Sequence, residues 1–372
     1  MQYRNYRFRL YPSKVTEEKL LRVLDACRWT YNKLLELKKT NHAGRLQLQA
    51  MLVGLKEETP ELKNVNSKVL QMVNNQLAYN LKVLAELKRN GKKVGKLRFK
   101  SENRYRTLNF NQSGFRVDYA SKKLWLSKIG FVPLKLHRLI KGQIKGVFVK
   151  RERTGKWFAI FQVGVNSEPL PSSKRAIGVD VGLKHFLTDS DGRHVENPRY
   201  YRKMLLKIRY LQRQVSKKRK GSANRRKAIL KLNRAYEKLT NQRDDFLHKL
   251  STFYVKSYGV IVTEDLQVTR MVRNRCFAQS ILDAGWGRFF GMLSYKAESA
   301  GRTLLKVNPA YTSQLNRDKV EDRDFRGAIN ILNRGLSGLG RPCVPVEIEP
   351  LRELVTVSAS SIIEAGSPHP SG

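Results

Sequence analysis

The stretch Ala176-Ile177-Gly178-Val179-Asp180-Val181-Gly182 sets a carboxylate at the edge of an apolar run, the pattern of a buried β-strand. Two later stretches repeat the arrangement, Val260-Ile261-Val262-Thr263-Glu264-Asp265 and residues 322–331. Carboxylates in apolar surroundings are costly unless something pairs with them, and divalent cations prefer such oxygen ligands. The three stretches therefore predict a metal site of the kind used for phosphodiester cleavage.

The charge of the chain indicates a polyanionic partner. Its 372 residues include 73 Lys and Arg against 31 Asp and Glu, a net charge of +42. A solvated surface needs a net charge of only about 2 to 8 per small domain. We therefore expect nucleic acid to bind, held largely by counterion release and weakened by salt. A membrane surface is a poorer candidate, because the chain has no run of roughly 18 apolar residues.

The cysteines predict neither disulfides nor a metal half-site. Cys27, Cys276 and Cys343 are isolated, and no Cys-x-x-Cys spacing occurs. No secretory leader opens the chain, so we expect a cytoplasmic, nucleoid-associated protein of a prokaryote.

Periodicity and turn signals predict an α/β domain preceded by a β-barrel and a small helical unit. Alternating residues at the start predict a strand, which would join further strands that follow a helical segment. The α/β part contains a basic insert with 17 Lys or Arg and one acid, Glu237, which predicts a helical hairpin. The expected organisation is a first barrel strand at 1–12, helices at 13–90, the rest of the barrel at 91–168, the α/β domain at 174–340 with its insert at 199–243, and a flexible tail at 341–372.

The placement of the acids favours an RNase H-like nuclease. One carboxylate would lie on a central strand, a second at the end of another strand, and a third at the start of a late helix. Two Mg²⁺ ions held by such acids activate the attacking water and stabilise the leaving oxygen. Carboxylates alone can hold these ions, so histidine ligands are not required.

Several motifs in order along residues 1–340 resemble the TnpB family of transposon-encoded proteins, which are similar to type V CRISPR effectors. They include Ile177-Gly178-Val179-Asp180-Val181-Gly182-Leu183-Lys184, residues 241–249, Thr263-Glu264-Asp265-Leu266, Asp283-Ala284-Gly285-Trp286-Gly287, residues 308–314 and Asp322-Arg323-Asp324. The resemblance implies a wedge-like β-barrel, a helical recognition domain and a RuvC-type RNase H-like nuclease domain. It also implies a guide RNA, a short target-adjacent motif and cleavage of double-stranded target DNA.

Matched to the family residue by residue, Asp180, Glu264 and Asp324 are the catalytic acids that would hold two Mg²⁺ ions. Asp324 is chosen over Asp322 because the family's last acid lies two positions before an Asn-Ala-Ala-x-Asn-Ile stretch. We expect Asp322 to be a surface or capping acid and Asp265 to be a solvated neighbour of Glu264.

The chain departs from the family in two places. A four-cysteine zinc module usually precedes the last acid, but residues 315–321 are all that separate Gln314 from Asp322, and they contain no cysteine. We therefore expect no zinc. Arg326-Gly327 also replaces the usual Asn-Ala. These departures leave open an RNA-guided DNA-binding protein or repressor that has lost cleavage, and a DNA-strand-joining transposase ranks below both.

Three groups of residues are candidates for nucleic-acid contacts, each with a solvated polar surface as the alternative. The basic hairpin would hold phosphates through Lys217, Lys218, Arg219, Lys220, Arg225, Arg226 and Lys227. The helical unit would read base edges through Lys68, Gln71, Asn74 and Asn75. The barrel would contribute Tyr105, Arg106, Thr107 and Asn109 or Asn111. RNA pairing would supply most of the specificity, and a monomer is the simplest expectation.

Overall fold

The computed structural model describes the chain except for residues 1, 103, 167–168, 311–321, 341–354 and 358–372. The chain divides into two compact units, Met1–Asn166 and Ser167–Gly372. Among the described residues, no helix is both long and apolar enough to cross a bilayer.

The first unit is built on a barrel-like sheet of seven strands. Neighbouring strands are antiparallel and follow the order β2-β6-β7-β1-β5-β4-β3. The strands are β1 (Gln2–Leu10), β2 (Thr107–Asn111), β3 (Phe115–Asp118), β4 (Lys123–Leu126), β5 (Gly130–Lys135), β6 (Gln143–Arg151) and β7 (Trp157–Val165). The opening strand is central, because β1 pairs with β7 along its whole length and with β5 at its end.

Two details of this sheet differ from the sequence interpretation. Phe99, within the range 91–168 that was expected to complete the barrel, lies in an irregular segment, 54% exposed, with the Lys39 ammonium 4.5 Å from its ring. Strand β5 was not predicted, because Gly130 and Pro133 are both residues that sequence patterns associate with turns.

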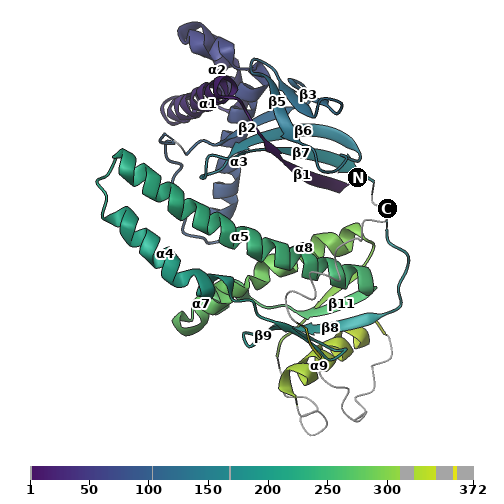
Figure 1. Cartoon of the computed structure of the whole chain (residues 1–372). Helices are drawn as coiled ribbons and strands as arrows, with labels where there is room; N and C mark the ends of the chain where they lie inside the picture. The colour runs from purple at the N-terminus through teal and green to yellow at the C-terminus, as the bar shows by residue number, and fades with distance from the viewer. Residues whose placement is uncertain (1, 103, 167–168, 311–321, 341–354, 358–372) are drawn as a thin grey trace. The chain divides into compact units, whose positions relative to one another are not determined.

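Helices inserted between β1 and β2 pack against one face of the sheet (Figure 1). They are α1 (Lys14–Thr40), α2 (Arg45–Glu58), a 3₁₀ turn η1 (Pro60–Asn64) and α3 (Ser67–Arg89). Ser13 caps α1, its hydroxyl accepting a hydrogen bond from the Thr16 amide at 3.3 Å. The buried Trp157 indole donates to Glu17 at 2.9 Å and so ties β7 to α1.

The second unit is built on a mixed six-stranded sheet, ordered β12-β11-β8-β9-β10-β13. Its strands are β8 (Ala176–Asp180), β9 (His185–Asp189), β10 (Arg193–Glu196), β11 (Val260–Glu264), β12 (Thr303–Val307) and β13 (Val355–Val357). Strands β8, β11 and β12 are parallel, β9 is antiparallel to β8 and β10, and β13 runs parallel to β10. Residues 355–357 were expected in a flexible tail, and the structure instead places them at this sheet edge. The rest of that tail lies outside the described residues.

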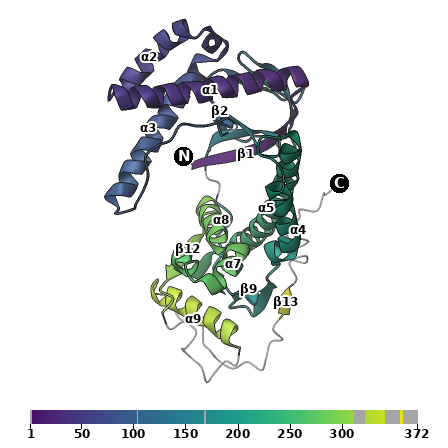
Figure 2. The same ribbon diagram turned by 90° about the vertical axis from the view of Figure 1, so that its left-hand side faces the viewer.

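Helices cover both faces of this sheet. They are α4 (Tyr200–Ser216), α5 (Ala223–Ser257), α6 (Val268–Met271), α7 (Arg275–Ala284), α8 (Trp286–Ser299) and α9 (Arg323–Ser337). Figures 1 and 2 show α9 on one face, with α5, α7 and α8 on the other. Gly178 of β8 is required here, because a Cβ would clash with the Ala328 carbonyl of α9.

Candidate active site

Asp180 and Glu264 lie at the same edge of the six-stranded sheet. Each is the last residue of its strand, β8 and β11, and these strands are parallel neighbours with Val179 opposite Thr263. The carboxyl ends of parallel strands meet at one edge, which is why two acids 84 positions apart in the sequence come together. Asp324 approaches the same edge from the first turn of α9.

Both strand acids are on the face that α9 covers. Side chains alternate along a strand, so Asp180 shares the face of Gly178, and Glu264 shares that of Val262. Val262 packs against α9, where a Cβ on Gly335 would lie 2.5 Å from its Cγ1. One turn beyond Asp324, a Cβ on Gly327 would lie 2.7 Å from Asp180 Oδ2. The missing side chain at Gly327 therefore leaves space for the Asp180 carboxylate beside α9.

The three acids influence one another electrostatically. The pKa of Asp180 is raised to about 7, first by burial and then by the negative charges of Glu264 and Asp324, while Arg323 opposes the rise. A carboxyl group whose pKa is raised by two other acids is a candidate functional group, because structural acids usually have basic partners.

The neighbouring acids behave as the sequence predicted. Asp322 is the N-cap of α9 and accepts a hydrogen bond from the Phe325 amide at 2.7 Å. Asp265 is exposed and pairs with Lys306 at 3.4 Å. The hydrogen bond of Asp322 and the ion pair of Asp265 do not by themselves indicate a metal ion at this edge. Within the described parts of the chain, no set of three or more His, Cys, Asp or Glu side chains is arranged closely enough to hold a metal ion.

Two histidines lie near this edge. His185 is on β9, and its ring is 4.7 Å from that of His194 on β10. Burial and the positive neighbours His194 and Lys184 lower the pKa of His185, against the opposing influence of Asp324 and Asp322. The two rings thus border the acids through β9 and β10.

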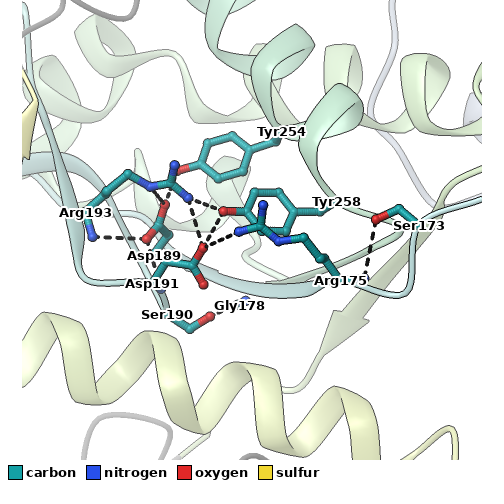
Figure 3. Close-up of polar contacts among 9 residues, drawn as sticks. All are labelled: Ser173, Arg175, Gly178, Asp189, Ser190, Asp191, Arg193, Tyr254 and Tyr258. Atoms are coloured by element: carbon teal, nitrogen blue, oxygen red, sulfur yellow. Dashed lines mark hydrogen bonds and ion pairs between the residues drawn. The ribbon is translucent and has the colours of Figure 1, made fainter. Parts of the chain in front are cut away.

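The opposite face of the sheet carries a buried, fully paired acid (Figure 3). Asp189 is 0% exposed and accepts hydrogen bonds from Arg193 Nε and the Tyr254 hydroxyl, both at 2.9 Å. Asp191 accepts from Tyr258 at 2.5 Å and from Arg175 at 3.2 Å. These contacts fasten the β9–β10 turn to the end of α5, so this cluster is structural.

The predicted basic hairpin is formed by α4 and α5, which join at the turn around Gly221. Lys217, Lys218, Arg219 and Lys220 are exposed, as are Arg226 and Lys227. Arg225 differs from them. Its guanidinium donates to the carbonyls of Val215 and Lys218, each at 3.0 Å, so it closes the C-terminal end of α4. We therefore assign Arg225 a structural role.

Asp283 anchors the hairpin, a role that the sequence analysis did not predict. It is 8% exposed at the end of α7, and its carboxylate accepts the backbone amides of Tyr201 at 2.8 Å and Arg202 at 3.1 Å. Arg243 of α5 completes the cluster at 3.2 Å. Asp283 therefore caps α4 from outside that helix. In the sequence, Asp283 was marked only by its place in a family motif. Its distance along the chain could not show that it contacts the start of α4.

The candidates in the helical unit have different surroundings. Lys68 is exposed on α3, and Gln71 and Asn75 are half-buried. Asn75 Oδ1 accepts a hydrogen bond from Arg45 at 3.2 Å. Asn74 is 0% exposed and donates to the Arg45 carbonyl at 2.9 Å, so it fixes α2 against α3 and is not available to read a base.

The candidates in the barrel are also mixed. Tyr105 packs on the core of the first unit, where burial raises the pKa of its hydroxyl. Arg106 lines a cavity of about 350 Å³ together with Arg104 and Arg153. Burial and these like charges lower the pKa of Arg106, so an anion would be favoured there. Thr107 begins β2 and is half-buried.

Zinc ligands are not apparent in the described residues. The cysteines there, Cys27 and Cys276, are both free, the first buried and the second exposed. The proposed deletion of the zinc module, near 315–321, lies outside the described residues.

Comparisons with known proteins identify related sequences and folds. Three family models match: "Probable transposase" at residues 156–275, "Helix-turn-helix domain" at 1–46, and "Cas12f1-like, TNB domain" at 286–331. A "Putative RNA-guided DNA endonuclease" from Streptomyces pristinaespiralis is 31% identical over 96% of this chain and 95% of its own length. The protein InsQ of Escherichia coli K12, with the same description, is 31% identical over 83% of this chain and 81% of its own.

A solved structure supports the fold. The protein of a Cas12f1-sgRNA-target DNA complex aligns with a TM-score of 0.53 over 89% of this chain and 99% of its own, at 14% identity. The fold is therefore Cas12f-like. Because the sequence relatives match over nearly their whole length, the chain belongs to the TnpB family of transposon-encoded RNA-guided nucleases.

Proposed function

We propose that this chain is an RNA-guided DNA endonuclease whose Asp180, Glu264 and Asp324 hold Mg²⁺ at a RuvC-type, RNase H-like site. The observation that supports the proposal is that Asp180 and Glu264 end neighbouring parallel strands, while Asp324 is in the first turn of α9, which packs on the same face. The negative charges of Glu264 and Asp324 add to the rise in the pKa of Asp180. The mixed sheet, with parallel β8, β11 and β12 and antiparallel β9, supports the RNase H-like assignment.

The residues present suit a hard divalent cation. Their donors are carboxylate oxygens, and Gly327 leaves room beside Asp180 Oδ2. When bound, Mg²⁺ would activate a water for attack on the phosphodiester and stabilise the leaving oxygen. The strand ends would position Asp180 and Glu264, and the Asp322 cap would fix the first turn of α9 and with it Asp324.

The basic surfaces would hold the polynucleotides. The exposed hairpin residues Lys217, Lys218, Arg219 and Lys220 would contact phosphates without reading sequence. Guide–target pairing would supply most of the sequence specificity, while the protein reads a short target-adjacent motif. We expect Lys68, Gln71 and Asn75 of α3 to take part in that reading, and the cavity lined by Arg106 to bind a phosphate.

A plasmid assay with the purified ribonucleoprotein tests the proposal. The protein should co-purify with a discrete RNA and cut a matched plasmid when Mg²⁺ is present. Asp180→Ala should abolish cutting and leave target binding nearly unchanged. Asp265→Ala, at the exposed neighbour of Glu264, is the matched control and should cut normally.

Two results would contradict the proposal. Tight binding of the matched target without any nick by the wild type would identify a guided DNA-binding protein. Co-purification of random cellular RNA alone would contradict the proposal that the protein is guided by RNA.

A further inference from the structure

The face of the six-stranded sheet that α9 covers carries a row of polar side chains that begins at Asp180. Asp180 of β8 lies opposite Thr188 of β9, and Thr188 lies opposite His194 of β10. Residues directly opposite one another share a face of the sheet, so these three side chains are neighbours. Thr188 and His194 are 2% and 4% exposed, and the Thr188 hydroxyl is hydrogen-bonded to His194 Nδ1 at 2.9 Å. A buried polar row therefore extends from Asp180 across β9 and β10.

The pairing of β9 with β10 contains an irregularity beside this row. The register shifts between Val195 and Glu196, and His185 is the residue opposite Glu196. Side chains alternate along a regular strand, so Phe186 would share the face of Thr188, and His185 would lie on the opposite face. A β-bulge changes this alternation and re-aims the side chains that follow it.

The contacts of Phe186 and His185 show that the bulge exchanges their faces. The Phe186 ring packs edge-on against Phe246 of α5 and Phe289 of α8, at centroid distances of 5.1 and 5.5 Å. These two helices cover the face opposite to α9. The His185 ring instead lies 4.7 Å from that of His194, which belongs to the polar row. The bulge therefore directs an imidazole to the face that carries the acids, and bulges are over-represented next to active sites.

His185 is also at the same edge of the sheet as the acids. It begins β9, whereas Asp180 ends β8, and the two strands are antiparallel neighbours. The strand order β11-β8-β9 thus sets Glu264, Asp180 and His185 along one edge. Burial lowers the pKa of His185, and the negative charges of Asp324 and Asp322 partly oppose this, so its ring is within electrostatic range of both acids. The side chain is half-buried, which leaves part of the ring accessible.

We propose that His185 contacts the DNA strand that is cut, and that its imidazole N–H donates a hydrogen bond to the phosphate next to the scissile one. The inference rests on the proposed nuclease function for the identity of the strand. Neighbouring strands of a sheet are about 4.8 Å apart. A group on β9 is therefore displaced toward the phosphate that adjoins the one held at Asp180 and Glu264. Thr188 and His194 are positioning residues, because they hold the His185 ring from behind.

An imidazole at this place suits a phosphate better than it suits the metal. Mg²⁺ prefers oxygen ligands, and the acids supply them, so His185 is not needed as a ligand. A phosphate accepts hydrogen bonds from N–H donors, and such charge-assisted bonds are stronger than bonds between neutral groups. Neutral and protonated imidazole each carry at least one N–H, so the contact does not depend on the ionisation of His185.

Single-turnover cleavage of a guided, labelled target compares two substitutions of His185. His185→Phe keeps a ring against His194 but removes the donor, whereas His185→Gln keeps a side-chain N–H. His185→Phe should slow cleavage about 10- to 150-fold, the range for one hydrogen bond to a charged group, and should leave target binding nearly unchanged. His185→Gln should recover most of the rate. The matched control is His137→Phe, at an exposed histidine of the first unit, which should cut as the wild type does.

A target with one neutral linkage separates a direct contact from a structural role. A methylphosphonate replaces one phosphate oxygen with a methyl group, and it is placed in turn at each linkage that flanks the cut. At one of these linkages it should slow the wild type as much as His185→Phe slows the normal target, and it should add little in His185→Phe itself. Thr188→Val removes the hydroxyl beside His194 and keeps the side-chain shape, so it should make this methylphosphonate penalty smaller.

Two patterns of cleavage would overturn the inference. The first is a wild-type rate in His185→Phe. The second is a methylphosphonate penalty that is equal in the wild type and in His185→Phe at every linkage, because His185 would then act only through the fold. Thermal unfolding identifies a variant that does not fold. If His185→Phe does not fold, the methylphosphonate penalty in Thr188→Val decides the question.

A wild type that never cuts would contradict the nuclease proposal but still allow a test of the contact. Docking of a target strand with 2-aminopurine beside the expected cut is then followed by fluorescence. If His185→Phe and the methylphosphonate each weaken docking, and together weaken it no further, the contact with His185 stands without cleavage. If docking is the same in the wild type and in His185→Phe, the contact is overturned as well.

Discussion

Asp180 and Asp189 are near neighbours in the same sheet and have opposite environments. Asp180 lies opposite Thr188, and Asp189 lies one step along β9, opposite Val179, so the two carboxylates emerge on different faces. Asp189 has a guanidinium and a tyrosine hydroxyl as partners, whereas Asp180 has two further acids nearby.

Burial raises the pKa of both carboxyl groups, so burial alone does not distinguish them. The neighbours do. At Asp189, the Arg193 side chain, the Arg193 backbone amide and Tyr254 oppose the rise, and Asp191 adds to it. At Asp180, Glu264 and Asp324 add to the rise, and Arg323 and the Val181 amide oppose it. A buried acid with basic or hydrogen-bonding partners stabilises the fold. An acid held beside other acids is better explained by a functional role.

The largest expected effect is on cleavage by the α9-facing acids. Glu264→Gln or Asp324→Asn should each lower the cleavage rate by at least about 1,000-fold, about 4 kcal/mol of activation free energy. Asp322→Asn is the control two residues away, since an asparagine caps a helix nearly as well as aspartate. If Asp322→Asn lost cleavage as Asp324→Asn does, the assignment of the third acid would be wrong. Single-turnover cleavage of a labelled target measures both.

On the other face, Asp189→Asn should destabilise the protein. It would leave the Arg193 guanidinium beside a neutral amide in a buried cluster, at a cost of about 3–5 kcal/mol. Chemical denaturation gives the free energy of unfolding. Asp265→Asn, on an exposed acid, should change it by less than about 0.5 kcal/mol. An Asp189→Asn variant as stable as the wild type would show that the cluster is not structural.

Asp180→Asn should do the reverse and stabilise the Mg²⁺-free protein. The folded pKa of Asp180, about 7, is above the unfolded value near 3.9, so the folded state keeps the proton longer. Wild-type stability therefore falls as pH rises from about 4 to about 7, and the asparagine variant should lack that fall.

At pH 7 the difference in the free energy of unfolding should be about 1–4 kcal/mol, measured by denaturation from pH 4 to 8. Added Mg²⁺ should raise the melting temperature of the wild type more than that of Asp180→Asn. Identical pH profiles for the two proteins would contradict the raised pKa.

The smallest effect is expected from Gly327→Ala. Its new Cβ would lie 2.7 Å from Asp180 Oδ2 and would push the carboxylate from its place. We expect about a tenfold slower cleavage, or about 1.4 kcal/mol, with little loss of DNA binding. Gly338→Ala at the C-cap of α9, where the nearest atom would be 3.5 Å away, is the matched control. Unchanged kinetics for Gly327→Ala would mean that Asp180 does not need this space.

The sequence predicted those features that depend on local pattern and family motif. Asp180 and Glu264 were singled out because each adjoins an apolar run, whereas the parallel pairing that brings them to one sheet edge came from the structure. The capping role of Asp322 followed from short-range chemistry and is confirmed by its hydrogen bond from the Phe325 amide. The Cas12f-like fold agrees with the resemblance to type V effectors.

What the sequence could not predict depends on contacts between distant residues. Asp283 caps a helix 82 positions away, and no spacing rule connects it to Tyr201. Asp189 and Asp191 stand near Gly192 and read as a turn, so their burial against Tyr254 and Tyr258 was not foreseen. In the sequence, Arg225 is indistinguishable from the other cations of the hairpin. Only the structure shows that its guanidinium donates to backbone carbonyls.

Helix α5 runs without interruption for 35 residues, from the basic hairpin to Tyr254 in its last turn. Because a helix rises about 1.5 Å per residue, α5 is one long, continuous and stiff element. Its final turn is fastened by Tyr254 to Asp189, the cross-strand neighbour of the residue before Asp180. A displacement of the exposed turn at Lys217–Lys220 would therefore be passed along α5 to strand β9, which pairs with the strand that carries Asp180.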